Sequence, residues 1–234
     1  MTQEQFKESL LELNINITED QLQKLEKYYE LLIEWNEKIN LTGITKKEEV
    51  YLKHYYDCLN ICRIIDLNSI DTLCDVGTGA GFPGMVLKIV FPNLKITLVD
   101  SLQKRLKFLE IVKEELKLSD IDMIHTRAEE YAIKNKEKFD VVTARAVAPL
   151  NILIEYCLPL VKINGYFIPL KANIEEEINN SQNALKQLNS NIEKIIEFNL
   201  PIENSHRSIL LIKKEEKTNK KFPRKYSEIK KKPL

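Results

Sequence analysis

A glycine-rich segment carries the strongest chemical signal in this sequence. It reads DVGTGAGFPG at residues 75–84 and lies between a short apolar run and a helical stretch. Glycines let the backbone turn tightly and approach a ligand that a Cβ would block, and a helix that follows such a turn presents unpaired N–H groups. The segment therefore predicts a site for a nucleotide-like cofactor. The alternative interpretation is an ordinary glycine-rich turn.

Two acidic residues indicate which cofactor the segment suits. Asp100 ends the next apolar run, 23 positions after Gly77, where a carboxylate can accept hydrogen bonds from ribose hydroxyls. Nicotinamide dinucleotides favour G-x-G-x-x-G, whereas this segment has G-x-G-x-G, with Gly79 as its second glycine and Phe82 where the last glycine of the dinucleotide pattern should stand. The anionic Asp75 also suits an ammonium and a sulfonium better than a pyrophosphate. The pattern thus favours S-adenosylmethionine.

The cysteines and histidines give no comparable signal. The four cysteines show no paired C-x-x-C spacing, and a chain of this length needs no disulfide, so we expect reduced thiols. His54, Cys58 and Cys62 recur every fourth residue on one helix face, but such a stripe is more typical of a core than of a metal site. Cys157 lies in an apolar helical segment and is interpreted as core. We expect no metal ion.

Elements that could position these residues appear along the whole chain. From residue 70 onward, short apolar runs alternate with helical stretches, which is typical of a parallel sheet with helices on both faces. The runs predict seven strands, near residues 70–76, 94–99, 121–125, 139–143, 164–170, 193–198 and 207–213. The clearest helix follows the second strand, with apolar residues at helical spacing from Leu102 to Leu116.

The first third of the chain is predicted to be helical. Apolar residues recur at helical spacing from Phe6 to Leu13 and from Leu22 to Ile39. The capping pattern Thr18-x-x-Gln21 predicts the start of the second helix, and Thr45-x-x-Glu48 predicts the start of a third. We therefore divide the chain into an N-terminal helical cap at residues 1–68, a cofactor-binding core at 69–213 and a basic tail at 214–234.

Composition and charge limit the remaining classes. The 234 residues are 44% hydrophobic and 30% charged, which predicts a globular protein. No apolar run approaches the roughly 20 residues of a membrane span, and the start MTQEQFKESL lacks a signal-peptide pattern, so we expect a cytoplasmic location and no membrane partner. The net charge of zero hides a basic end, since residues 213–234 hold ten basic and three acidic residues. Such a run attracts phosphate backbones, or it is simply a solvated lysine-rich tail.

Several segments together resemble one known family. They are Asn40-Leu41-Thr42, His54-x-x-Asp57, DVGTGAGFPG at 75–84, LVDSLQKR at 98–105, Arg127-Ala128-Glu129, Ala144-Arg145-Ala146-Val147-Ala148 and the basic ending FPRK…KKPL. In this order they are similar to the RsmG family, also called the glucose-inhibited division protein B group, over nearly the whole chain. The resemblance implies an α/β fold, namely a Rossmann-like class I S-adenosylmethionine-dependent methyltransferase sheet of seven strands with an N-terminal helical cap. It also implies methyl transfer to N7 of a guanine in the 530-loop region of bacterial 16S ribosomal RNA.

The resemblance also implies roles for single residues. Gly77 and Phe82 would lie near the methionine part of the cofactor, Asp100 would hold the ribose, and Ala128 with Glu129 would meet the adenine. The set of expected cofactor residues is Asp75, Gly77, Gly79, Phe82, Asp100, Ala128, Glu129 and Arg145. Lys171, Arg207, Arg224 and Lys225 are the expected RNA contacts. We expect the substrate to be 16S ribosomal RNA in the small subunit or an assembly intermediate, and the protein to be a monomer.

Guanine N7 chemistry explains why we name no proton-transfer residue. N7 already presents a lone pair in the plane of the ring, so attack on a sulfonium methyl group requires no general base. The protein must then position the reactants and stabilise moving charge, with Arg145 and Lys171 as candidate substrate clamps. Two alternatives stay open: a small-molecule or protein methyltransferase on the same fold, and a non-catalytic RNA-binding assembly protein.

Overall fold

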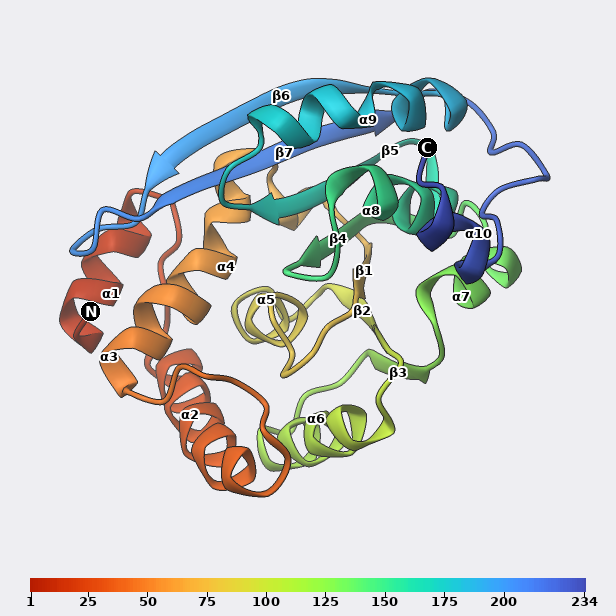
Figure 1. Ribbon diagram of the computed structural model, residues 1–234. Helices are drawn as coiled ribbons and strands as arrows, with labels where there is room; N and C mark the ends of the chain where they lie inside the picture. Colours follow the sequence, from red (N-terminus) through yellow and green to blue (C-terminus); the bar gives the residue numbers. More distant parts are fainter.

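A seven-stranded sheet forms the centre of the computed structural model, which describes all 234 residues (Figure 1). The strand order is β3-β2-β1-β4-β5-β7-β6. The strands are β1 Thr72–Val76, β2 Lys95–Asp100, β3 Ile121–His125, β4 Phe139–Arg145, β5 Val161–Lys171, β6 Ser190–Asn199 and β7 His206–Lys214. The seven predicted strands are confirmed. β7 runs antiparallel to both β5 and β6, a reversal that the sequence pattern did not indicate.

Helices cover both faces of this sheet. They are α5 Gly84–Val90, α6 Gln103–Glu115, α7 Ala128–Lys134, α8 Leu150–Cys157 with the following 3-10 turn η4 Leu158–Leu160, and α9 Glu175–Gln187. The predicted helix between Leu102 and Leu116 corresponds to α6 and is confirmed. No helix in the chain combines the length and the apolar composition that a membrane span requires.

The two faces of the sheet belong to two separate hydrophobic clusters. Neighbouring strand residues point to opposite faces, so Leu73 of β1 enters one cluster and Cys74 enters the other. The larger cluster of 43 buried residues joins the cap, α5 and α6 to the sheet. The smaller cluster of 25 joins α7, α8 and α9 to the opposite face, and Cys157 lies in it with no exposed surface. The interpretation of Cys157 as core is confirmed.

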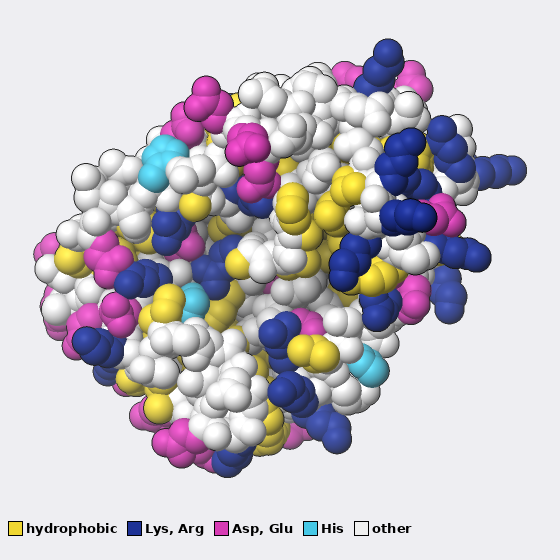
Figure 2. Space-filling model, in the orientation of Figure 1, with side chains coloured by type: hydrophobic (Ala, Val, Ile, Leu, Met, Phe, Trp, Pro, Cys, Tyr) yellow, Lys and Arg dark blue, Asp and Glu magenta, His cyan; other side chains and the backbone are white.

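The C-terminal segment, residues 215–234, folds back over the smaller cluster. It contains one short helix, α10 Tyr226–Lys231, which lies beside α7 and α8 in Figure 1. Phe222 and Ile229 are its buried apolar side chains, 2% and 0% exposed. In Figure 2, Lys and Arg side chains gather on the side of the molecule where Figure 1 shows α10. The C-terminal segment is therefore packed against the core while its lysines are exposed, and Lys214, which precedes it, is buried.

The cap consists of two regular helices and one irregular one. Its elements are α1 Gln3–Leu11, α2 Glu19–Ile39, α3 Lys47–Val50, the π-helical turn η1 Tyr51–Tyr56, α4 Asp57–Leu59, and the 3-10 turns η2 Asn60–Arg63 and η3 Leu67–Ser69. The capping box of Thr18 and Gln21 is confirmed. The predicted cap at Thr45 is wrong, because Lys46 stands at the N-cap and its carbonyl accepts the first helical N–H groups.

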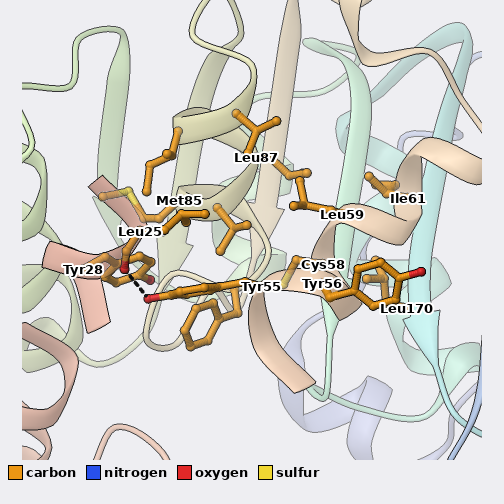
Figure 3. Packing of buried hydrophobic residues seen from close by; sticks show 14 of the residues in the cluster. Leu25, Tyr28, Tyr55, Tyr56, Cys58, Leu59, Ile61, Met85, Leu87 and Leu170 are labelled. Carbon is orange, nitrogen blue, oxygen red and sulfur yellow. Dashed lines mark hydrogen bonds between the residues drawn. The ribbon is translucent and has the colours of Figure 1, made fainter. Parts of the chain in front are cut away.

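Aromatic residues of the cap fill the space between α2 and the glycine segment. Tyr28 donates a hydrogen bond to the Ala80 carbonyl, and its ring centre lies 5.6 Å from that of Phe82. Figure 3 shows Tyr28 and Leu25 of α2 beside Tyr55, whose hydroxyl donates to the Leu25 carbonyl at 3.0 Å. The cap thus has no core of its own and shares the larger cluster with the sheet.

Candidate functional site

A cavity of about 430 Å³ opens at the carboxyl ends of β1, β2 and β4. This is the edge where ligands bind in open α/β sheets, and the volume lies within the roughly 300–1,000 Å³ of small-molecule sites. The lining includes Gly77, Asp100, Ala128 and Glu129, which the sequence analysis had assigned to a cofactor. Four residues, from the turn after β1, the end of β2 and the start of α7, therefore meet in one cavity.

The glycine turn meets this cavity at Gly77, whereas Gly79 does not line it. Gly77 has φ +72°, and a Cβ built on it would lie 2.5 Å from Cγ2 of Val147. Gly81 has φ +98°, and a Cβ there would lie 2.5 Å from the Tyr28 hydroxyl. Residues other than glycine rarely adopt this left-handed backbone conformation. The turn is consequently fixed from both sides, by the loop after β4 and by the cap.

Asp100 places a nearly buried carboxylate at the end of β2. It is 3% exposed and accepts hydrogen bonds from the Gly79 N–H at 2.9 Å and the Leu102 N–H at 2.8 Å. Arg105 Nη1 lies 3.3 Å from its Oδ2. A carboxylate has about four acceptor positions, so these donors leave capacity for a ribose hydroxyl. The Arg105 side chain, 35% exposed, is the partner free to move aside.

Glu129 brings a second carboxyl group to the cavity from the first turn of α7. It is 4% exposed and makes no hydrogen bond to another side chain. Burial raises the pKa of Glu129. Burial makes the charged form of this carboxyl group costly, and a ligand that donates a hydrogen bond to it would offset part of that cost. The amino group of an adenine is such a donor, so Glu129 and its neighbour Ala128 fit the adenosyl part of S-adenosylmethionine.

Asp75 lies behind the glycine turn and outside the cavity lining. Its Oδ2 accepts from Thr78 Oγ1 at 2.7 Å and from the Gly84 N–H at 2.9 Å, while its Oδ1 has no partner. Burial raises the pKa of Asp75 to about 6 although both donors oppose the shift. The carboxylate thus ties the turn to the start of α5.

Arg145, at the end of β4, reaches into the cap. Its Nη1 lies 2.9 Å from the Lys53 carbonyl and 3.1 Å from Oδ2 of Asp57, and its Nη2 lies 3.0 Å from Nδ1 of His54. The guanidinium carbon lies 5.3 Å from the centre of the Phe82 ring. Neither Arg145 nor Phe82 lines the cavity. The structure therefore places these two predicted cofactor residues together, at the contact between cap and sheet.

His54 connects this contact to the loop after α2. Burial, with Arg145 adding to it, lowers the pKa of His54 to about 3, so the ring is neutral near pH 7. A guanidinium can only donate, so Nδ1 must accept and Nε2 must carry the proton. Nε2 lies 2.9 Å from Oγ1 of Thr42, and the ring stacks on Phe82 with centres 4.3 Å apart. Thr42 and His54 both lie in segments that resemble the family, and the sequence pattern had indicated a core position for His54.

The predicted RNA contacts occupy different environments. Lys171 Nζ lies 2.7 Å from Oε2 of Glu177, and Arg207 Nε lies 3.0 Å from Oδ1 of Asp57. Arg224 pairs with the buried Glu155 at 2.6 Å, whereas Lys225 is exposed and forms no ion pair. Three of the four cations already have an acidic partner, and the fourth is free to meet a phosphate.

Several residues of the cavity wall were not predicted from the sequence. The additional lining residues include Val147, Ile152, Tyr156, Tyr226 and Lys230. Ile152 and Tyr156 lie on α8, and their apolar spacing indicates only a helix face. Tyr226 and Lys230 lie on α10, at the far end of the chain, and no local pattern places them at the sheet.

Comparisons with known proteins find relatives along nearly the whole chain. A family profile described as "GidB: rRNA small subunit methyltransferase G" matches residues 21–206. A protein of Bacillus subtilis named ribosomal RNA small subunit methyltransferase G is 49% identical over 237 residues, covering 100% of this chain and 99% of its own. A protein of the same name from Bacillus cytotoxicus is 51% identical over 228 residues, covering 96% and 95%.

Solved structures share the fold at low identity. An S-adenosylmethionine-dependent methyltransferase from Aquifex aeolicus is 14% identical with a TM-score of 0.53, covering 71% of this chain and 93% of its own. TYW2 of M. jannaschii, solved in complex with S-adenosylmethionine, is 13% identical with a TM-score of 0.52, covering 62% and 69%. The predicted methyltransferase fold is confirmed.

Proposed function

Because this chain belongs to the ribosomal RNA small subunit methyltransferase G family, we propose that it methylates N7 of a guanine in the 530-loop region of 16S ribosomal RNA. Membership makes it a methyltransferase, and S-adenosylmethionine is its cofactor. The base, the atom and the loop are the proposal. The observation that supports it is the cavity at the ends of β1 and β2, where Gly77 and two buried carboxyl groups could hold the methyl donor that this reaction requires.

Each part of the cofactor has a partner in the cavity under this proposal. Asp100 holds the ribose hydroxyls, and Ala128 with Glu129 meets the adenine. Gly77 allows the backbone to lie close to the methionine part. When bound, the cofactor supplies a methyl group on a positively charged sulfur. The chain's own residues bind and orient it, and the apolar side chains of Val76, Val99 and Val147 exclude water from the same wall.

The thiol groups favour a reaction without a covalent enzyme intermediate. Methylation at a pyrimidine C5 requires a cysteine nucleophile, and the thiolate is its reactive form. Burial raises the pKa of Cys58 and of Cys62 to about 12. Burial also raises the pKa values of Cys74 and Cys157 well above the ordinary thiol range. All four thiols are therefore protonated near pH 7, and none is in the thiolate form that covalent catalysis requires. This favours a target atom, such as guanine N7, that attacks the methyl group without such help.

Positively charged residues would orient the RNA. Arg145 and Lys171 stay our candidate clamps for the guanine or its phosphate, although each now pairs with an acidic residue. Arg207, Arg224 and Lys225 would contact the backbone of the RNA, in the small subunit or an assembly intermediate. A partly solvated ion pair can exchange its carboxylate for a phosphate at low cost when the RNA arrives. The pair of Arg224 with the fully buried Glu155 would instead stay intact, and Arg224 would contact the RNA from that position.

The proposal is tested by mapping the methylated nucleotide. The protein is incubated with radiolabelled S-adenosylmethionine and small-subunit particles from cells that lack the modification. N7-methylguanine is then revealed by borohydride reduction and aniline cleavage of the RNA. We expect one label and one strand break, at the same guanine of the 530-loop region. Particles that already carry the modification serve as the control and should take up no label.

Two outcomes would contradict the proposed methylation of guanine N7 in the RNA. A label on a pyrimidine or on an exocyclic amine would overturn the assignment of the atom. A label that stays with ribosomal protein, or that appears only on small molecules, would overturn RNA as the substrate.

A further inference from the structure

The C-terminal segment is held to the core by a buried ion pair. Glu155 of α8 is 0% exposed, and its carboxylate accepts three hydrogen bonds from Arg224. The backbone N–H and Nε donate to Oε1 at 2.9 and 2.8 Å, and Nη2 donates to Oε2 at 2.6 Å. A guanidinium in such a fork is fixed in direction as well as in place. Arg224 therefore sets where the following helix begins.

The helix that follows carries two residues into the cavity wall. Tyr226 and Lys230 of α10 line the cavity together with Tyr156 and Ile152 of α8. These residues lie one helical turn apart on α10, so they share one face of the helix. Lys231, on the same helix, does not line the cavity. One face of α10 thus lines the cavity, Ile229 packs into the smaller cluster, and Lys231 is exposed to solvent.

A direct contact joins α10 to the loop that is expected to meet the adenine. The guanidinium carbon of Arg127 lies 4.4 Å from the centre of the Tyr226 ring. Arg127 is the N-cap residue of α7, immediately before Ala128 and Glu129. Cation–π contacts of this kind fix a ring relative to a charged side chain. The ring of Tyr226 is consequently held at the end of the cavity that Glu129 occupies.

We propose that the C-terminal segment is part of the cofactor site, with Tyr226 closing the adenosyl end of the cavity and Arg224 acting as its positioning residue. This inference rests on the proposed function, because it takes the adenosyl group to lie beside Ala128 and Glu129. It changes the role of a segment whose charge alone suggests RNA binding. Tyr226 supplies aromatic contact surface, and Arg224 acts through the Glu155 pair.

The test measures cofactor binding without any RNA. Isothermal titration of the full-length protein with S-adenosylmethionine compares wild type with Tyr226→Ala, Tyr226→Phe and Lys231→Met. We expect Tyr226→Ala to raise Kd about fivefold, which corresponds to the loss of one aromatic contact. Tyr226→Phe keeps the ring and should stay within about twofold of wild type, as should the outward-facing control Lys231→Met.

A second variant tests the anchor. Arg224→Met should raise Kd for the cofactor about as much as Tyr226→Ala, because α10 loses its fixed starting point. Tyr226 is 39% exposed, so Tyr226→Ala removes no core side chain, and circular dichroism verifies that each variant is folded. Tyr226→Ala binding within twofold of wild type would overturn the inference. Wild type that binds the cofactor but leaves the RNA unlabelled would contradict only the proposed function.

Discussion

The two ends of the chain both pack against the core, and they do so in different ways. The N-terminal cap joins the larger hydrophobic cluster through large buried side chains such as Phe6, Tyr28 and Tyr55. The C-terminal segment joins the smaller cluster through Phe222 and Ile229, plus one ion pair. The cap is thus continuous with the core, whereas the C-terminal segment is attached to its surface.

The two ends also reach opposite sides of the cofactor loop. Tyr28 of the cap contacts the glycine turn at Ala80, on the side away from the cavity. Tyr226 of α10 lies on the cavity side, next to Arg127. A well-packed region suits the side that must keep its shape, and a lightly attached one suits the side where ligands enter. Each end has the kind of packing that its position requires.

The largest expected effect comes from shortening a buried side chain of the cap. Leu25 is 0% exposed in the larger cluster, so Leu25→Ala should lower the free energy of unfolding by roughly 2–5 kcal/mol. Urea denaturation followed by circular dichroism measures this loss, and one cooperative transition should remain. A separate transition of the cap at lower urea concentration would contradict the view that the cap is continuous with the core, because the cap would then unfold as an independent unit.

An intermediate effect concerns pH at the contact between cap and sheet. The pKa of His54 is about 3 in the folded protein, below about 6.5 when unfolded. The unfolded chain alone binds this proton between those values, so the stability that His54 contributes falls as pH drops below 6.5. The advantage of wild type over His54→Asn in unfolding free energy should therefore shrink by about 2 kcal/mol from pH 7 to pH 5.

The pH dependence of the stability that Asp75 contributes has the opposite sign, so the proteins compared in that experiment must both contain Asp75. Its folded pKa of about 6 lies above an unfolded value of about 3.9, so its contribution to stability rises as pH falls through this window. Both proteins in the comparison retain Asp75, and its effect cancels. If the advantage of wild type is equal at pH 7 and pH 5, the pKa of His54 is not lowered by burial. The contact between the cap and the sheet would then be as loosely packed as the C-terminal segment.

The smallest expected effect comes from the C-terminal segment. Ile229→Ala is the matched partner of Leu25→Ala, since Ile229 is also 0% exposed. We expect Ile229→Ala to lower the free energy of global unfolding by under about 1 kcal/mol. The reason is that the C-terminal segment can detach before the core unfolds, so that a contact within it adds little to the stability of the core. Trypsin should cut residues 215–234 several times faster than in wild type. A loss as large as that of Leu25→Ala would make the two ends equivalent.

The parts of the fold that were predictable depend on local patterns. Apolar runs located all seven strands, and the capping box at Thr18 located α2. The glycine turn and Asp100 were found because their chemistry is local to a strand end. The partners of Arg145 were not predictable, because Asp57 lies 88 positions away in the sequence. Tyr226 was missed for the same reason, since its place in the cavity depends on a distant ion pair.

One carboxylate of the cap holds two strands at once. Asp57 accepts Arg145 of β4 on one oxygen and Arg207 of β7 on the other. The cap and the sheet therefore cannot be inherited as interchangeable pieces. A chimera that joined this sheet to the helices of a distant relative would have to bring an acid to the same point, or leave both arginines without their shared carboxylate.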